Sequence, residues 1–227
     1  MTTATRCDEV SFDVRGATAT LELRRPDKRN AVTAPMWEAI LHHLASSANR
    51  EEIRVLVLRG AGAAFCAGAD LDAVKNADGS PATSYHALAV EALSAIAAFP
   101  VPSVACIQGA CIGGGCSLAL ACDLRAAGPS AVFGIPAVRY GIVYDGGSIA
   151  RLRELVGPGN AARLLYTAER VDAQTAARIG LVDECTDDYD RFVAEFARHV
   201  SLGDRSSIAA NRQLLRGLAY PTALHSG

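Results

Sequence analysis

The stretch Val101–Asp123, VPSVACIQGACIGGGCSLALACD, decides how the rest of the chain is interpreted. It contains an apolar run, Val104–Ile107, that is too short for a helix and lies between a proline and a glycine, so it predicts a buried strand. Three glycines, Gly113–Gly115, come next, and then a small apolar run, Cys116–Ala121, suited to a helix interior. We therefore expect the glycines at a strand-to-helix turn, at the N-terminus of a helix.

A helix N-terminus made of glycines is a candidate site for a ligand oxygen that becomes negative. The first amides of a helix have no partner within the helix, and the helix dipole adds positive potential there. Glycine has no side chain to keep a ligand away from these amides, and such donors stabilise charge that develops during a reaction. The alternative is that the glycines only allow tight packing of the helix. The run matches neither GxxxxGK[ST] nor GxGxxG, so it does not indicate a phosphate loop.

Composition and charge restrict what the chain can bind. The 227 residues fit one domain and are half apolar, and a net charge of −2 with few aromatic residues argues against nucleic acid and anionic membrane as partners. The start of the chain, MTTATRCDEV, has no apolar signal region, and no apolar run reaches the roughly 20 residues of a membrane span. The seven cysteines lack zinc-ligand spacing, so no metal is expected. We expect a cytoplasmic protein.

Apolar periodicity predicts an α/β fold in which strands and helices alternate. Two glycine-rich turns, Gly60–Asp70 and Gly113–Gly115, each follow a buried strand, so a sheet with right-handed crossovers is expected, with a helical region from Gly146 onward. The expected elements are a hairpin at Val10–Leu23, strands at Val55–Leu58, Val104–Ile107, Leu124–Ala126 and Val132–Phe133, helices at Met36–Leu44, Leu88–Phe99, Ile149–Val156, Ala161–Tyr166, Asp172–Arg178, Tyr189–Val200 and Ile208–Leu218, and a short strand or extended turn at Ile179–Val182.

Several blocks of sequence, in order over most of the chain, resemble one family. They are LRRPDKRNAV (Leu23–Val32), FCAGADL (Phe65–Leu71), GGGCSLALACDLRAA (Gly113–Ala127), FGIPAVRYGIV (Phe133–Val143) and TAERVDAQTAARIGLVDEC (Thr167–Cys185). Together they resemble the enoyl-CoA hydratase/isomerase superfamily, the crotonases. The resemblance implies a crotonase-like spiral of ββα units with a C-terminal helical region, an acyl-CoA substrate, and homotrimers or dimers of trimers. Coenzyme A would enter as part of the thioester substrate, with no permanently bound cofactor.

The resemblance also implies an oxyanion hole. In the family, two backbone amides hold the thioester oxygen as it becomes an enolate, and the matching positions are Ala67 in FCAGAD and Gly114, the middle glycine. Asp70 and Asp123 lie in family blocks and have a simpler interpretation as structural hydrogen-bonding residues. Further contacts to the CoA thioester are expected from Gly68, Ala69, Asp70 and Gly113, and contacts to CoA phosphates from Arg24, Lys28 and Arg29, whose alternative is a solvated loop.

The sequence departs from the family's hydratases at both catalytic glutamates. The positions that match them hold Ser117 and Ala137. Water addition to an enoyl thioester needs one group to deprotonate water and another to protonate carbon, and neither residue is suited to this. The standard hydratase mechanism is therefore not expected, whereas the fold and the oxyanion hole require neither glutamate.

Another carboxylate can take over the proton transfer. Asp145 lies where family members of other activity carry a catalytic aspartate, and Tyr144 matches a tyrosine of decarboxylase-like members. The alternative is that both residues only form a turn and cap the helix that begins at Gly146. Arg139 and Arg151 are candidate ion-pair partners for Asp145, which would lower its basicity.

The expected function is acyl-CoA processing through a stabilised enolate, by an isomerase, decarboxylase or non-standard hydratase of fatty acid metabolism. An inactive acyl-CoA-binding homologue is the alternative, and a purely structural subunit is a third possibility. Turnover of a thioester panel separates the first two, and protection by CoA in thermal melts tests the third. We expect a core domain of residues 1–200 and a shortened C-terminal helical segment of residues 201–227, in which only Ala219–Gly227 extend beyond the family match.

Overall fold

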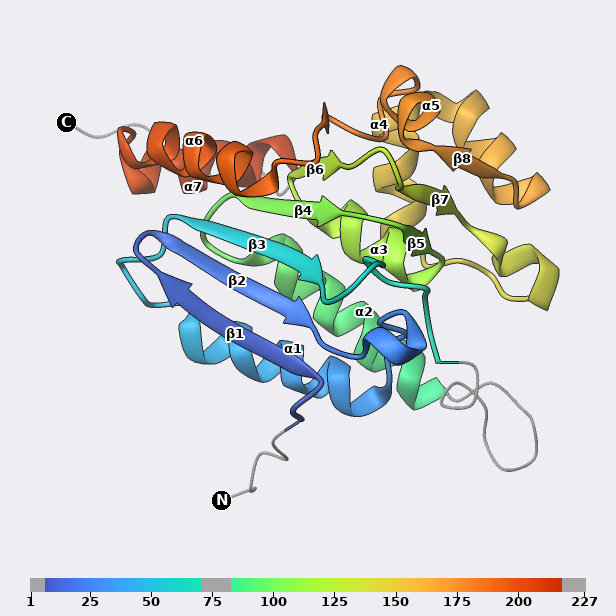
Figure 1. Ribbon diagram of the computed structural model, residues 1–227, viewed down its shortest axis with the longest axis horizontal. Coiled ribbons are helices and arrows are strands. Elements are labelled where there is room, and N and C mark those ends of the chain that lie inside the picture. The colour runs from blue at the N-terminus through green and yellow to red at the C-terminus, as the bar shows by residue number, and fades with distance from the viewer. Residues whose placement is uncertain (1–6, 71–82, 218–227) are drawn as a thin grey trace.

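The computed structural model describes residues 7–70 and 83–217. The stretch Ala219–Gly227, which was expected to extend beyond the family match, therefore lies outside the described residues. Its centre is a six-stranded sheet in which the first two strands form an antiparallel hairpin and the following strands join in parallel (Figure 1). In their order across the sheet, the strands are β1 (Val10–Arg15), β2 (Thr18–Leu23), β3 (Val55–Gly60), β4 (Ser103–Ile107), β6 (Leu124–Ala127) and β9 (Glu184–Cys185).

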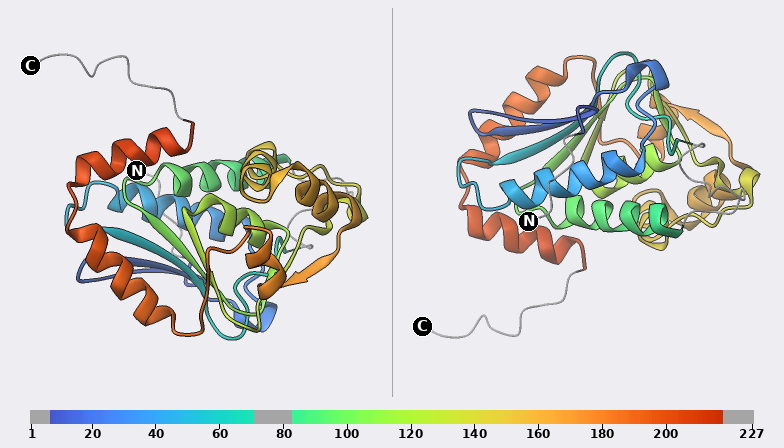
Figure 2. Two further views of the ribbon diagram at one scale, coloured as in Figure 1. Left: turned by 90° about the horizontal axis from the view of Figure 1, so that it is seen from above. Right: turned by 90° about the horizontal axis from the view of Figure 1, so that it is seen from below.

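Helices cover both faces of this sheet, which confirms the predicted α/β class. The larger core lies under α1 (Ala34–Ser47), α2 (Thr83–Ala98) and α3 (Gly114–Ala121). A smaller core on the opposite face joins the sheet to α6 (Tyr189–Ser201). The central strands are buried on both faces, and this is why they read as continuous apolar runs rather than as alternating patterns. Figure 2 shows the two helical layers with the sheet between them.

A second, three-stranded sheet departs from the prediction of a single sheet. It consists of β5 (Ala110–Ile112), β7 (Val132–Gly134) and β8 (Arg170–Asp172). After β4 the chain turns at Gly109, whose φ of +55° suits glycine and whose added Cβ would lie 2.0 Å from the carbonyl oxygen of Ala63. At this turn the chain leaves the large sheet and enters β5 and then α3.

From Gly146 to the end of the described residues the chain is mainly helical, as predicted. The two helices expected after Gly146 form one element, α4, with a kink at Gly157, where φ is +74° and a proline follows. Asp172 caps the next helix by accepting a hydrogen bond from Thr175 N at 2.8 Å. The stretch Ile179–Val182 forms a turn rather than a strand. The bounds are α4 (Gly146–Thr167), α5 (Ala173–Arg178) and α7 (Arg205–Leu215), with 3-10 turns η1 (Pro26–Lys28) and η2 (Pro136–Tyr140).

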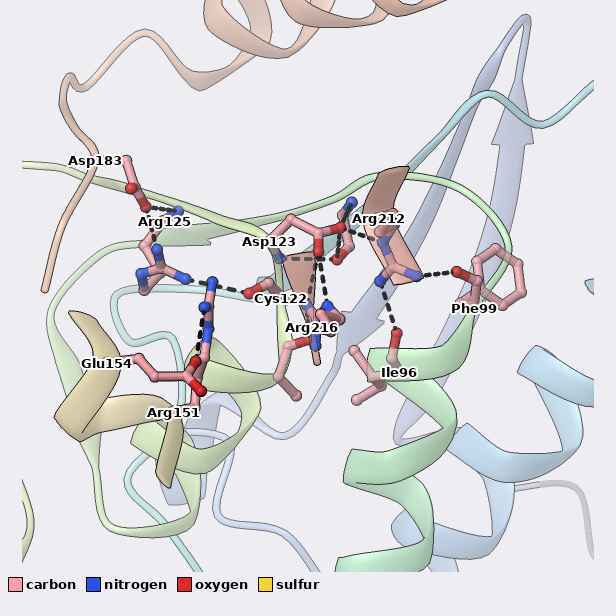
Figure 3. A network of polar contacts seen from close by, with 12 residues as sticks. Ile96, Phe99, Cys122, Asp123, Arg125, Arg151, Glu154, Asp183, Arg212 and Arg216 are labelled. Carbon is pink, nitrogen blue, oxygen red and sulfur yellow. Dashed lines mark hydrogen bonds and ion pairs between the residues drawn. The ribbon is translucent and has the colours of Figure 1, made fainter. Parts of the chain in front are cut away.

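Two arginines fix α7 to the rest of the molecule (Figure 3). Arg212 Nε donates to Asp123 Oδ2 at 2.6 Å, and its other nitrogens reach carbonyl oxygens at the end of α2. Arg216 donates to Asp123 Oδ1 and to the carbonyl oxygen of Ala121 at the end of α3, each at 2.7 Å. Burial tends to raise the pKa of Asp123, but the two guanidinium groups outweigh it and lower that pKa below its ordinary value. Asp123 is therefore structural, as one reading of the sequence proposed.

Candidate active site

The three consecutive glycines have three different physical roles. Gly113 has a φ of +53° and open space around it, so it serves the turn. A Cβ at Gly115 would lie 2.3 Å from the carbonyl oxygen of Cys66, so this glycine allows close packing. A Cβ at Gly114 would be in ordinary contact, 3.6 Å from Ala69 N, and would occupy the space in front of that amide. Packing alone therefore does not account for the middle glycine.

Hydrogen bonding decides which amide of the FCAGAD loop faces Gly114. Ala67, the predicted donor, gives its N–H to the carbonyl oxygen of Arg29 at 2.9 Å, so this amide is occupied and the prediction is wrong. Ala69 is bridged to Val32 as in a parallel sheet, an arrangement in which the amide of Ala69 points away from Val32. Within residues 7–70 and 83–217, neither Ala69 N–H nor Gly114 N–H has a backbone acceptor. The pair of free amides is thus Ala69 and Gly114.

The neighbouring loop holds these amides in place. The buried side chain of Asn30 donates to the carbonyl oxygens of Ala61 and Ala64 and accepts from Arg25 N, which ties the loop after β2 to the loop after β3. Arg25 forms an ion pair with Asp70 at 2.5 Å, and this interaction raises the pKa of Arg25. Asp70 therefore has a structural role here, and Arg25, which the sequence analysis did not single out, organises the loop.

The other cations of the loop point away from this network. Arg24 is more than half exposed and lies 3.8 Å from Glu22. Lys28 and Arg29 are exposed, and no acidic group of the described chain forms an ion pair with either side chain. Exposed cationic groups of this kind are suited to phosphate.

Ser117, Tyr144 and Asp145 meet beside the N-terminus of α3. Ser117 Oγ lies 2.7 Å from Tyr144 Oη and 3.0 Å from Asp145 Oδ2. Tyr144 Oη donates to the carbonyl oxygen of Gly113 at 2.8 Å. Burial raises the pKa of Tyr144 well above its ordinary value, so the phenol keeps its proton and acts as a donor. The sequence pointed to Tyr144 and Asp145 together, but not to their contact with Ser117.

The two carboxylate oxygens of Asp145 have different partners, one on α4 and one at the candidate site. Its Oδ1 accepts from Ser148 N at 2.7 Å and caps α4, as the simpler interpretation proposed. Its Oδ2 faces Ser117 instead of a cation. Arg139 donates to the carbonyl oxygen of Ala168 and Arg151 pairs with Glu154, so the suggested ion pairs with Asp145 do not form. Capping and a role at the site are therefore compatible.

A cavity of about 490 Å³ opens beside this group. It lies between α2, α3 and α4, and Arg216, the residue that follows α7, contributes to its wall. Most of its lining is apolar, with a few polar groups, as in sites that take a small organic ligand. Its walls include Val90, Leu93, Ala97, Leu120, Ser117 and Asp145. A second groove, of about 580 Å³, lies on the opposite side, between the outer face of the large sheet and α6, away from the glycine turn.

In the described ranges, no group of three or more His, Cys, Asp or Glu side chains is placed to hold a metal ion. No helix among the described residues is both long and apolar enough to cross a bilayer. All seven cysteines are free thiols, and burial raises the pKa of Cys66 to about 12.

Comparisons with known proteins agree with this architecture. The family profile described as Enoyl-CoA hydratase/isomerase matches residues 13–218. A protein of Mycobacterium bovis named probable enoyl-CoA hydratase echA6 is 38% identical over 184 residues, 80% of this chain and 73% of its own length. The crotonyl-CoA hydratase of Syntrophomonas wolfei is 37% identical over 167 residues, 73% and 64% of the two chains. A crystal structure of an enoyl-CoA hydratase/carnithine racemase from Magnetospirillum magneticum has a TM-score of 0.86 and 32% identity, and the match covers 97% of this chain and 84% of that one.

The fold and the two loops that meet at the glycine turn define an α/β protein of the crotonase type. The chain belongs to the enoyl-CoA hydratase/isomerase family, a class of lyases and isomerases that act on acyl-CoA thioesters.

Proposed function

We propose that this protein processes an acyl-CoA thioester by stabilising its enolate between the amides of Ala69 and Gly114. The observation that carries the proposal is a pair of N–H groups, one on a loop and one at a helix N-terminus, that have no backbone acceptor among the described residues, with Gly114 adding no side chain beside them. Preorganised donors of this kind stabilise an oxygen that gains charge in the transition state, by about 3–4 kcal/mol for each donor. In this proposal, Gly113 and Gly68 precede the two donor residues and allow the backbone turns that bring their amides together.

Asp145 is the proposed proton-transfer group. Its Oδ2 would take a proton from the carbon next to the thioester, while the electron pair of the broken C–H bond moves to the thioester oxygen held by the two amides. Return of the proton to a different carbon completes an isomerisation. Ser117 and Ala137 replace the glutamates of the hydratases, so isomerisation, decarboxylation or a non-standard hydration fits the residues better than standard hydration.

The remaining features of the proposal concern the substrate and the assembly. The CoA part of the substrate would contact the loop with Arg24, Lys28 and Arg29, and its acyl part would enter the apolar cavity, without a resident cofactor. Assembly into homotrimers or hexamers, a cytoplasmic location and a role in fatty acid metabolism are predictions from the family resemblance.

Acyl-CoA binding without turnover is the second candidate function, favoured by the absence of both glutamates. Binding of enoyl-, dienoyl- and malonyl-type thioesters with consumption of none would support it.

We expect Asp145→Asn to lower turnover of the best substrate of that panel by roughly 10²-fold, the scale for loss of a general acid or base. Stability should remain close to that of the wild type, because asparagine caps a helix nearly as well as aspartate. Steady-state kinetics and thermal melts measure the two effects. The matched control is Asp172→Asn, which changes a cap on α5 outside the site and should alter neither quantity much. Full turnover in the Asp145→Asn protein would exclude a catalytic role.

We expect Lys28→Glu to weaken CoA binding at low salt by several-fold and to reduce the dependence of binding on salt, because a free cation would become a repulsive carboxylate next to phosphate. Calorimetric titration at two salt concentrations tests this. Arg15→Glu, at the far end of the β1–β2 hairpin, makes the same change of charge and should leave affinity nearly unchanged. Equal affinities in wild type and Lys28→Glu would remove Lys28 from the binding site.

A further inference from the structure

The peptide group that joins Gly113 to Gly114 is held in an unusual way. Its N–H, on Gly114, is one of the two proposed oxyanion donors. Its carbonyl oxygen, on Gly113, accepts two hydrogen bonds, from Tyr144 Oη at 2.8 Å and from Ser117 N at 3.1 Å. The second bond is an ordinary helical one, whereas the first comes from a side chain that lies on another element. The orientation of this peptide therefore depends on Tyr144.

Tyr144 is in turn connected to the acid of the site. Ser117 Oγ stands between Tyr144 Oη, at 2.7 Å, and Asp145 Oδ2, at 3.0 Å. The chain of groups runs Asp145, Ser117, Tyr144 and the carbonyl of Gly113. The two hydroxyl protons of Ser117 and Tyr144 serve three oxygen–oxygen contacts, so one contact lacks a proton when Asp145 is ionised. A proton taken up by Asp145 Oδ2 completes the chain, with every hydroxyl donating toward Gly113.

We propose that Tyr144 and Ser117 are positioning residues that orient and polarise the Gly113–Gly114 peptide and link it to Asp145. A hydrogen bond to a peptide carbonyl strengthens the N–H of the same peptide as a donor, because the two groups polarise each other. When Asp145 receives the substrate proton, the hydroxyl proton of Ser117 turns from Asp145 to Tyr144, and this strengthens the hydrogen bond that Tyr144 donates to Gly113. The amide of Gly114 thus becomes a stronger donor at the moment when the thioester oxygen becomes negative. This inference rests on the proposed function and gives Ser117 a positioning role in the candidate active site.

The position of Tyr144 supports this indirect role. Its hydroxyl is engaged by Ser117 and by the Gly113 carbonyl, and its raised pKa keeps the proton on the phenol. Tyr144 is absent from the lining of the cavity, whereas Ser117 and Asp145 belong to it. The earlier expectation of Tyr144 as a catalytic residue is thereby replaced by a positioning role.

The test is the absorbance of a bound aromatic acyl-CoA, which shifts to the red when its thioester carbonyl is polarised. We expect Tyr144→Phe and Ser117→Ala each to reduce the red shift by about 10–30%, and to lower kcat/KM by about 3- to 10-fold. The affinity for free CoA should not change. The double variant should show less than the sum of the two effects, because both substitutions interrupt one chain.

Two controls separate this role from general destabilisation. Tyr189→Phe also removes a phenol that donates to a backbone carbonyl, that of Ile107 at 2.6 Å, and Ser47→Ala removes a buried hydroxyl on α1. Both should keep the full red shift. Equal shifts in the wild type and in both site variants would overturn the inference and leave the proposed function standing. A wild-type protein that binds the probe without a shift would overturn both. If Tyr144→Phe does not fold, Ser117→Ala decides on the same readout.

Discussion

Gly114→Val is expected to abolish polarisation of a bound thioester and to lower turnover by roughly 10²- to 10³-fold, the cost of losing an oxyanion donor. The new Cβ would lie 3.6 Å from Ala69 N, so it occupies the space of the ligand oxygen without a clash that moves the backbone. The branched side chain extends further into this space and separates the oxygen from both amides. The red shift of a bound aromatic acyl-CoA and the steady-state rate measure the effect.

The control for this variant is Gly159→Val. Gly159 lies in α4, and apart from the backbone of its own helix no described atom lies within 4 Å of an added Cβ, so the same substitution tests the general effect of valine. Circular dichroism should show that both proteins are folded. An unchanged red shift in Gly114→Val would place the oxyanion hole elsewhere. The neighbouring Gly115 is unsuitable for this experiment, because its Cβ would meet the carbonyl oxygen of Cys66 at 2.3 Å and disturb the packing of α3.

Asp123→Asn is expected to lower the free energy of unfolding by about 3 kcal/mol, near the lower end of the range for a broken buried ion pair. Asp123 is 22% exposed, and it neutralises Arg212 and Arg216, whose side chains are 10% and 12% exposed. The neutral amide leaves two largely buried guanidinium groups without their counter-charge, next to the ends of α2 and α3. Urea unfolding at pH 7 measures the loss.

The pH dependence of this effect follows from the lowered pKa of Asp123. A carboxylate with a folded-state pKa below its unfolded value contributes stability that is fully present above the unfolded pKa, about 4. That stability is lost as the pH falls through the folded pKa, because the proton then binds both states. The difference between wild type and Asp123→Asn should therefore be large at pH 7 and shrink below about pH 4. Repeating the urea titration at pH 3 tests the sign.

A surface ion pair provides the comparison. Arg191 and Glu195 lie 3.1 Å apart on α6, with both side chains more than half exposed. Glu195→Gln should cause no measurable loss, because exposed pairs contribute little. If Asp123→Asn is as stable as Glu195→Gln, the arginines do not depend on Asp123 and the docking of α7 has another cause.

The order of the elements and the position of the glycine turn could be predicted from local sequence patterns. Apolar runs such as Val104–Ile107 report burial on both faces of a sheet, and the helical stripes report a period of 3.6 residues. Both patterns depend only on residues close in the sequence, so they can be recognised before the fold is known. The sequence did not reveal β5, because a strand as short as Ala110–Ile112 between glycines has no periodicity to detect.

Which amides and which side chains meet at the candidate site depends on contacts between distant segments. Ala67 and Ala69 are alike in the sequence, and the hydrogen bond from Ala67 N to the distant carbonyl oxygen of Arg29 distinguishes the two amides. Ser117 meets Asp145 across 28 residues, and Asp123 meets Arg212 across 89. Local patterns specify how a residue is buried, whereas the direction of one N–H or the partner of one charge depends on how distant segments pack. The sequence therefore predicted the region of the candidate site, and the packing of its loops determined which groups of that region meet.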